Sequence, residues 1–304
     1  MSFFSVEYPR VAVALAVYNG EKWLEEQVAT VLLQKNVNIT VYLSVDPSED
    51  RSKKVAEYIC NKNENVILLS PKESSGSAAM NFFRIMMDVD VDKYDYFSFC
   101  DQDDLWLSEK LIEAIRCLES SNSEVYSSNL NTFGLSNILV KKCYSVKSFD
   151  YLFQGASAGC TYVISKNTAI FLKSVIEKNI TNFPQRPSHD WLIYAICRSH
   201  EKKWYFDSRS FVLYRQHENN VRGAVKGISG YINRLEVSRT GWYRQHILKM
   251  KPFLRGTSDE LEIINHIESM SLVDRLWLMM RVNKFRRRFR EQVMLFFVFM
   301  FNMF

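Results

Sequence analysis

The chain has 304 residues, of which 47% are hydrophobic and 14% are aromatic, with only 10 Gly and 6 Pro. This composition excludes a disordered chain and a fibrous repeat, and the length can fill one large or two smaller cores. The formal net charge of +5 is modest, which gives no sign of a generally nucleic-acid-binding surface. Six cysteines lie far apart without the spacing of zinc or redox motifs, so we expect buried free thiols.

The N-terminal residues 1–9 do not resemble a secretion signal. They lack a basic region followed by an apolar core and a small-residue cleavage site. We therefore expect a cytoplasmic protein.

The first hundred residues alternate between strand and helix patterns. The predicted strands span 11–17, 39–45, 66–70 and 94–100, and the predicted helices span 23–32, 52–60 and 77–87. This alternation predicts an α/β fold with a parallel sheet.

The second half is less regular. Beyond a predicted helix over 108–118 with Ser108 as its N-cap, residues 120–148 show no clear pattern. The remaining predictions are strands over 160–165 and 210–214 and helices over 168–177 and 191–199. We expect a catalytic domain over 1–223 and a helical C-terminal region over 224–304.

Polar residues follow three of the predicted strands, at Asn19, Asp46 and Asp101. Ligands of open α/β sheets bind at the carboxyl ends of the strands, so these side chains are expected to converge. Asp101 opens the run Asp101-Gln102-Asp103-Asp104 after a buried strand, and Mg²⁺ or Mn²⁺ binds such carboxylates together with substrate phosphates. The alternative is a solvated acidic turn capping the next helix, a role we assign to Asp104.

At this point the chain resembles a family 2 glycosyltransferase of the GT-A fold, and within it the bacterial rhamnosyltransferases of surface polysaccharide synthesis, such as O-antigen or capsule. The resemblance covers about residues 10 to 223. It is carried in order by residues 16–20, 46–50, 81–82, 101–106, 159–161, 189–191 and 214–217 with Asn220. It implies a GT-A type, Rossmann-like nucleotide-diphospho-sugar transferase sheet with a helical C-terminal extension.

The resemblance also implies roles for single residues. Asp103 would be the principal ligand of a divalent metal, with His217 completing the site. Asp190 would be the catalytic base, although an isolated Asp at a helix start is more often a cap. Asp46 would accept a hydrogen bond from the nucleotide base, and Asp101 would lie near the ribose and donor sugar.

Further donor-binding positions follow from the same motifs. They are Ala16, Tyr18, Asn19, Asn81, Gln102, Trp106, Trp191 and Arg215. For Trp106 and Trp191, buried packing is the competing interpretation, and for Arg215 a structural salt bridge. His217 has the alternative of a histidine hydrogen-bonded by Arg215.

The turn at 46–50 departs from the family pattern. Val45 stands where a second aspartate is usual, and Pro47 restricts the backbone where glycine would be free. The turn that would recognise the base therefore differs in sequence from the family pattern, and Asp50 has the alternative role of a helix cap.

The implied reaction is an inverting, single-displacement transfer of L-rhamnose from dTDP-rhamnose to a hydroxyl of a lipid-linked glycan. UDP-glucose and UDP-galactose are alternative donors. A nucleotidyltransferase is a second enzyme class, but the loop after the first strand offers only Gly20 for a phosphate cradle. A catalytically weak membrane-surface scaffold is the non-enzymatic alternative.

The C-terminal tail, residues 281–304, joins six Arg and Lys residues between 281 and 290 to the apolar run 293–301. The run is far shorter than the roughly 20 residues needed to span a bilayer. We expect an amphipathic segment on the inner face of the cell membrane, with packing onto its own domain as the alternative. The tail holds no recognised nucleic-acid-binding motif, so nucleic acid is not an expected partner.

Overall fold

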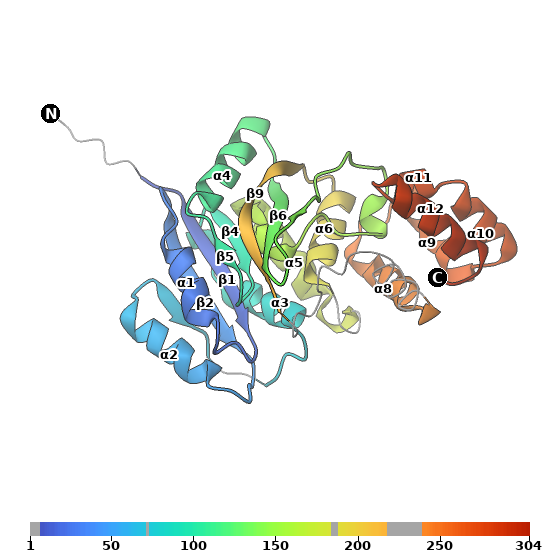
Figure 1. The fold of residues 1–304 in the computed structure, drawn as a ribbon. Coiled ribbons are helices and arrows are strands. Elements are labelled where there is room, and N and C mark those ends of the chain that lie inside the picture. The colour runs from blue at the N-terminus through green and yellow to red at the C-terminus, as the bar shows by residue number, and fades with distance from the viewer. Residues whose placement is uncertain (1–6, 71–72, 184–187, 218–238) are drawn as a thin grey trace.

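The computed structural model describes residues 7–70, 73–183, 188–217 and 239–304. The predicted boundary between the two regions, at residues 223 and 224, and the motif residue Asn220 lie outside these ranges. Within them, strands and helices form a sheet covered on both faces, with a helical C-terminal part at one end (Figure 1).

In the described part of the chain, the sheet has nine strands in the order β3-β2-β1-β4-β8-β6-β9-β5, with β7 paired to β6. The strands are β1 Arg10–Val17, β2 Asn38–Val45, β3 Val66–Leu68, β4 Tyr96–Cys100, β5 Leu105–Trp106, β6 Val125–Gly134, β7 Leu139–Val140, β8 Val163–Ser165 and β9 Trp204–Gln216. The α-helices are α1 Leu24–Leu32, α2 Ser52–Lys62, α3 Ala78–Asp88, α4 Lys110–Ser121, α5 Lys166–Lys178, α6 His189–Ser199, α8 Trp242–Met250, α9 Ser258–Ser269, α10 Leu272–Met279, α11 Val282–Phe285 and α12 Phe289–Met300.

The central strand β1 separates two hydrophobic cores because its side chains alternate between the faces of the sheet. Val11, Val13 and Leu15 pack with residues of α1, α2 and α4 on one face. Ala12 and Ala14 face α3, α5 and α6 on the other. The small alanines allow α3 to lie directly against β1 and β2. The apolar run 11–17 is therefore a strand that is buried on both faces of the sheet.

The parallel sheet predicted from the first hundred residues is confirmed for β3, β2, β1 and β4, and the later strands add antiparallel pairs. β8 pairs antiparallel with β4, through Ser98 and Val163, and β6 pairs antiparallel with β8 and parallel with β9. The sheet is thus mixed. The parallel strands β6 and β9 are connected through α5 and α6, whereas in the described chain no α-helix lies between the antiparallel strands β6 and β8.

The long strand β6 occupies the region in which the sequence showed no pattern. Its buried positions include Ser127, Ser128 and Asn129, so it lacks the hydrophobic signal of a strand. Tertiary hydrogen bonds satisfy these side chains: Asn129 Nδ2 donates to Ser208 O at 2.5 Å, and Asn129 Oδ1 accepts from Cys143 N at 2.9 Å. Such partners are distant in sequence, and no local pattern reveals them.

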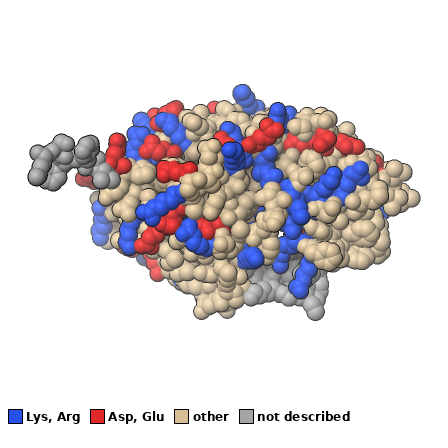
Figure 2. Space-filling view, turned by 90° about the horizontal axis from the view of Figure 1, so that it is seen from above, with Lys and Arg blue, Asp and Glu red and all other residues tan. Residues whose placement is uncertain are grey.

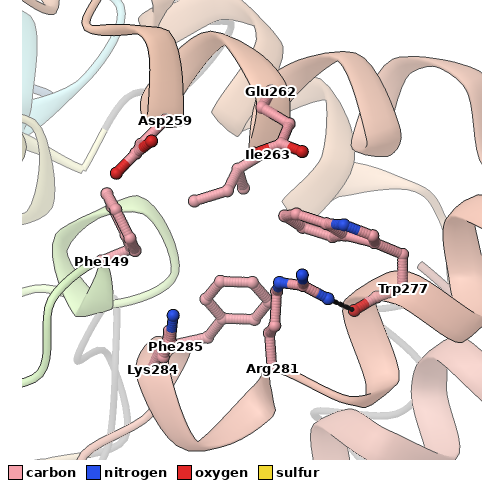
Figure 3. A pocket seen from close by; sticks show the side chains of 8 residues that line it. All are labelled: Phe149, Asp259, Glu262, Ile263, Trp277, Arg281, Lys284 and Phe285. Atoms are coloured by element: carbon pink, nitrogen blue, oxygen red, sulfur yellow. Dashed lines mark hydrogen bonds between the residues drawn. The ribbon is translucent and has the colours of Figure 1, made fainter.

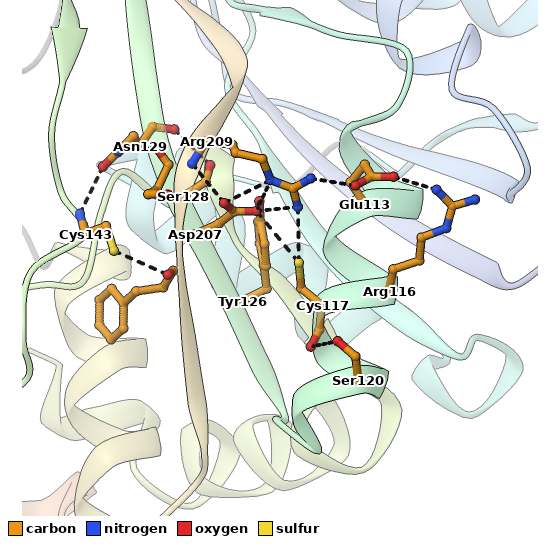
Figure 4. Close-up of polar contacts among 12 residues, drawn as sticks. Glu113, Arg116, Cys117, Ser120, Tyr126, Ser128, Asn129, Cys143, Asp207 and Arg209 are labelled. Carbon is orange, nitrogen blue, oxygen red and sulfur yellow. Dashed lines mark hydrogen bonds and ion pairs between the residues drawn. The ribbon is translucent and has the colours of Figure 1, made fainter.

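A polar network on β9 extends this strand well beyond the predicted 210–214 and fixes it to β6 and α4 (Figure 4). The Asp207 carboxylate accepts from Arg209 Nη2 at 2.8 Å and from the Tyr126 hydroxyl at 3.0 Å. Arg209 also pairs with Glu113 of α4 at 2.7 Å. The prediction for α4 itself was wrong at its start, because Glu109 and not Ser108 is the N-cap residue.

The C-terminal helices pack against the catalytic part through aromatic rings and a buried ion cluster. Phe153 stacks on Phe285 at 4.3 Å between ring centroids and also contacts Phe299 and Phe304. Beside it, the fully buried Asp150 pairs with Arg287 at 3.3 Å and with Arg198 at 3.4 Å. Phe285, Leu295, Val298, Phe299 and Phe304 of the tail are therefore part of the core, as the competing interpretation for residues 281–304 expected.

Two further sequence predictions can be compared with the described residues. All six cysteines are free thiols, as predicted, and four of them are buried. Among the described helices, none combines the length and the apolar character that crossing a bilayer requires.

We predict that Asp150→Ala destabilises the protein by about 3–5 kcal/mol, because it leaves the buried Arg287 and Arg198 charges uncompensated. The free energy of unfolding, measured by urea denaturation, checks this value. The matched control is Asp90→Ala, which removes an exposed partner of Lys93 and should cost less than about 1 kcal/mol. Equal losses in the two variants would contradict the structural role of the Asp150 cluster.

Candidate active site

The loops after β1 and β4 are held together by one side chain. Gln102 Oε1 accepts a hydrogen bond from Tyr18 N at 2.8 Å, and Gln102 Nε2 donates to Tyr18 O at 2.9 Å. Gly20 lies against the same amide, where a Cβ atom would stand 2.4 Å from Gln102 Oε1. Gln102 therefore positions the first loop, and Tyr18 keeps its ring exposed beside the acidic run.

The loop after β1 is also bonded to the turn after β2. Asn19, with a φ of 47°, accepts from Glu49 N at 2.9 Å through its side chain, and its N–H donates to Ser48 Oγ at 3.1 Å. Asp50 accepts from Glu21 N at 3.0 Å and from Ser52 N at 2.9 Å. Asp50 thus joins two loops in addition to binding the start of α2, and the turn keeps a defined shape despite Pro47.

A buried arginine that the sequence analysis missed lies beside Asp46. Arg84 Nη1 is 3.7 Å from Asp46 Oδ1, and both side chains are almost inaccessible to solvent. No hydrogen bond to the Arg84 guanidinium is found among the described residues, whereas Asp46 also accepts from the Ser75 hydroxyl. A single Arg within the apolar helix α3 was the available signal. The pair therefore places the Asp46 carboxylate, a hydrogen-bond acceptor, next to the buried N–H donors of Arg84.

Two of the predicted donor-binding residues, Asn81 and Ala16, are buried in the scaffold of this region. The Asn81 amide exchanges hydrogen bonds with Ser44, donating to Ser44 O at 3.0 Å and accepting from the Ser44 hydroxyl. It therefore fixes α3 to the end of β2. Ala16 lies near the end of β1 in the core on the α3 side.

The two predicted metal ligands meet in the structure. His217 Nε2 lies 2.7 Å from Asp103 Oδ2, although the two residues are far apart in sequence. Ligand atoms of Asp101, Asp104 and Cys160 all lie within 4.8 Å of one another next to them. The buried Asp104 Oδ2 has no nitrogen or hydroxyl donor among the described residues. These oxygen and imidazole groups fit a divalent cation.

Crowding of like charges perturbs this acidic cluster. Burial raises the pKa of Asp101 to about 7, and the nearby Asp103 and Asp190 carboxylates add to the increase. Burial and the neighbouring Asp101 and Asp103 also raise the pKa of Asp104 well above its usual value. Such like-charge coupling is typical of functional carboxylates.

A buried lysine beneath the cluster is a second residue that the sequence analysis missed. Lys110 Nζ lies 3.2 Å from Ser98 Oγ and 3.4 Å from the centre of the Trp106 ring, and burial lowers the pKa of Lys110 to about 7. Trp106 is itself buried, which matches the packing alternative for this residue. The only sequence signal was a lysine in the first turn of a helix, a common surface feature.

Asp104 does not cap the following helix, so that assignment was wrong. α4 begins only at Lys110, and Asp104 Oδ1 instead accepts from Arg215 N at 3.1 Å. The Arg215 guanidinium donates to Asp103 O at 2.8 Å and pairs with Glu26 at 2.5 Å above the Trp23 ring. Arg215 thus secures the end of β9 to the acidic loop, as the salt-bridge alternative expected.

The candidate base Asp190 is positioned near the acidic cluster by the packing of the preceding residue, His189. The His189 ring lies 4.4 Å from that of Phe82 and 5.6 Å from that of Phe99, between centroids. A Cβ atom at Gly159 would stand 2.0 Å from His189 Nε2, so only glycine fits there. Asp190 Oδ1 accepts from Trp191 N at 2.8 Å, and its charge acts on Asp101.

Trp191, predicted to line the sugar pocket, is buried under the C-terminal helix α8. Its ring lies 4.5 Å from the His246 ring and 6.0 Å from the Trp242 ring, and its Nε1 donates to Tyr151 O at 2.8 Å. This is the packing that the alternative interpretation expected. Trp191 connects the start of α6 to the C-terminal helices.

Residues 12–178 match the model of glycosyl transferase family 2. The chain is also 36% identical over 294 residues to the dTDP-rhamnosyl transferase RfbG of Shigella flexneri, which covers 95% of this chain and 100% of that protein. The chain belongs to glycosyl transferase family 2. It is an enzyme of the glycosyltransferase class.

Solved structures share the fold at low identity. S. aureus TarS 1–349 in complex with UDP-GlcNAc superposes with a TM-score of 0.59 at 15% identity, over 84% of this chain and 70% of TarS 1–349. The mannosyltransferase PcManGT from Pyrobaculum calidifontis, in complex with GDP-Man and Mn²⁺, superposes with a TM-score of 0.53 at 14% identity, over 89% and 72%. The predicted GT-A type α/β fold with C-terminal helices is therefore confirmed.

We predict that Asp101→Asn changes the pH dependence of stability in metal-free protein. The pKa of Asp101 is about 7 in the folded state, against about 4 unfolded. Because the folded protein binds the Asp101 proton more tightly than the unfolded chain, protonation of Asp101 stabilises the fold at low pH. This stabilisation is lost as the pH rises through 7. The variant should gain on the order of 1 to 3 kcal/mol over the wild type between pH 4 and 7.5.

Urea denaturation with EDTA at several pH values measures this difference. The control is Asp92→Asn, which removes an exposed carboxylate and should run parallel to the wild type. Parallel curves for Asp101→Asn and the wild type would contradict the raised pKa.

Proposed function

We propose that this glycosyltransferase moves L-rhamnose from dTDP-rhamnose to a hydroxyl of a glycan acceptor in cell-surface polysaccharide synthesis, with inversion at the anomeric carbon. The observation that carries the reaction type is that the Asp190 carboxylate is near enough to Asp101, at the carboxyl end of β4, for its charge to raise the pKa of Asp101. The full-length similarity to a dTDP-rhamnosyl transferase supports the donor.

The buried Asp46–Arg84 pair supports a thymine or uracil base. The edge of these bases presents an N–H donor between two carbonyl acceptors. The Asp46 carboxylate accepts from the N–H, while the Arg84 guanidinium donates to a carbonyl oxygen. Burial makes both bonds selective, because a base with the wrong pattern leaves a charged group without a partner.

Asp103 and His217 would hold a Mg²⁺ or Mn²⁺ ion, with Asp101 close by. The ion supplies positive charge to the leaving nucleoside diphosphate. The residues of the chain supply its position: Gln102 and Asn19 fix the loops that border the nucleotide, and Arg215 fixes the acidic loop.

Asp190 acts as the general base. Its carboxylate takes the proton from the attacking acceptor hydroxyl as that oxygen bonds to the anomeric carbon and the bond to the diphosphate breaks. One displacement gives inversion and needs no covalent enzyme intermediate. His189, packed against Phe82 and Gly159, keeps the carboxylate in place.

The acceptor is proposed to be lipid-linked, and residues 281–304 are proposed to bind the inner face of the cell membrane. UDP-glucose and UDP-galactose are the alternative donors. A catalytically weak scaffold is the alternative of another class, and it would release no nucleoside diphosphate.

A donor screen with Asp190→Asn tests the reaction. We expect release of dTDP from dTDP-rhamnose with Mn²⁺ or Mg²⁺ present, exceeding the release from UDP- and GDP-sugars. The substitution should reduce turnover about 10²- to 10⁴-fold with unchanged unfolding free energy. Asp90→Asn, on the surface, is the control. If no donor releases a nucleoside diphosphate, the proposed activity is refuted. If UDP is released in preference to dTDP, the donor is a UDP-sugar and not dTDP-rhamnose.

Arg84→Gln tests recognition of the base. The loss of a buried charged hydrogen bond should weaken dTDP binding about 10- to 100-fold. Binding of inorganic diphosphate should not change, since Arg84 lies beside Asp46 and not in the acidic run. Isothermal titration calorimetry gives both constants, with the exposed Arg116→Gln as control. Equal weakening for dTDP and diphosphate would show that Arg84 does not act on the base.

A further inference from the structure

Helix α10 and helix α12 turn rows of large apolar side chains toward solvent. On α10, Leu272, Leu276 and Met280 recur at intervals of four residues, together with Val273, and the exposed fractions of Leu272, Val273 and Met280 are 65%, 72% and 73%. On α12, Phe289, Val293, Phe297 and Phe301 recur at the same interval, with 76% exposed for Phe289 and 62% for Phe301. Spacing of four residues places each row on one face of its helix.

The rows lie opposite the faces that pack into the protein. Leu278 of α10 is buried, as are Leu295, Val298 and Phe299 of α12. The two helices contact each other, and Arg275 of α10 donates to Met300 O at 3.2 Å across this contact. The buried contacts of α10 and α12 are thus made by other residues, and the exposed rows do not contribute to the core.

Only part of the basic cluster in the tail is available to a partner. Arg287 is buried against Asp150, and Arg281 lies 3.8 Å over the Trp277 ring and donates to Trp277 O. Arg281 also lines, with Asp259 and Glu262, a cavity of about 150 Å³ behind α10 and α11 (Figure 3). These cations therefore serve the protein itself.

The remaining charges favour an anionic partner. Arg288 and Arg290, at the start of α12, are exposed, and Arg288 also pairs with Glu291 at 3.6 Å. Lys284 is exposed at the rim of the cavity that Arg281 lines. The acidic residues of these helices are Asp274 and Glu291, whose side chains are only 15% and 13% exposed, and Asp274 is bonded to His266. Figure 2 shows Lys and Arg gathered where the C-terminal helices meet the rest of the protein, beside a largely uncharged end.

We propose that the outer rows of α10 and α12 form one membrane-docking face that inserts at the headgroup boundary of an anionic bilayer. Apolar side chains enter the acyl boundary, while Arg288 and Arg290 contact the lipid phosphates. The face includes α10 and so extends beyond the tail over 281–304, whose inward side chains belong to the core. Its purpose rests on the proposed function, since it brings the active site to a lipid-linked acceptor.

Vesicle flotation of the full chain tests the face. Leu272→Gln/Leu276→Gln/Met280→Gln changes α10, and Phe289→Gln/Phe297→Gln/Phe301→Gln changes α12. The control, Leu33→Gln/Ile67→Gln/Leu135→Gln, changes three equally exposed apolar residues of the catalytic part. All nine positions lie on the surface, and circular dichroism confirms the folded state.

We expect the wild type to float with vesicles of phosphatidylcholine and 30% phosphatidylglycerol, and at least tenfold less with phosphatidylcholine alone. Each triple variant on α10 or α12 should lower the partition coefficient at least tenfold, and the control should stay within twofold. Arg288→Gln/Arg290→Gln should remove most of the preference for the anionic lipid.

The proposal would be overturned if the α10 variant floated with anionic vesicles as well as the wild type does. It would also be overturned if the wild type did not bind these vesicles. A wild-type dimer in sedimentation velocity that the α10 variant converts to monomer, without binding to vesicles, would assign the face to a second copy. Release of dTDP from dTDP-rhamnose without vesicles is measured in parallel. Its absence would refute the proposed reaction, whereas normal release without flotation would refute only the docking face.

Discussion

The active site depends on the repulsion among carboxylates held together at the end of β4. Asp101, Asp103 and Asp104 share a poorly hydrated space, and burial, together with the repulsion between the carboxylates, raises the pKa of Asp101 and Asp104. Such an arrangement persists only when surrounding groups offset its charge. Lys110 lies beneath the cluster, the His217 imidazole lies 2.7 Å from Asp103, and a divalent cation bound with substrate would offset the remaining negative charge.

The rest of the catalytic part can be understood as the support for this cluster. Gln102 ties the acidic loop to the loop after β1, Asn19 and Asp50 tie that loop to the turn after β2, and Arg215 ties the end of β9 to Asp103. These bonds join strands that are separated in sequence but neighbours in the sheet. Few of the support side chains can act on substrate directly, because their polar atoms are already used.

The C-terminal helices pack against the catalytic part on one side and expose apolar side chains on the other. Their inner side meets the catalytic part through Phe285 and Arg287, and α8 covers Trp191 beside the candidate base. Their outer side carries apolar rows that the core does not use. The proposed reaction with a lipid-linked acceptor would use both sides, because the acceptor hydroxyl would come to Asp190 from the membrane.

The sequence by itself determined the alternating first half of the sheet, the acidic run after a buried strand, and the family, because these features depend on local periodicity and on ordered motifs. Only the tertiary structure decided the mixed sheet, the strand β6 and the burial of Arg84 and Lys110. These features depend on hydrogen bonds and charges between residues far apart in the chain. For the same reason, the sequence could predict Asp103 and His217 as a pair only through a resemblance, whereas the fold brings them to 2.7 Å.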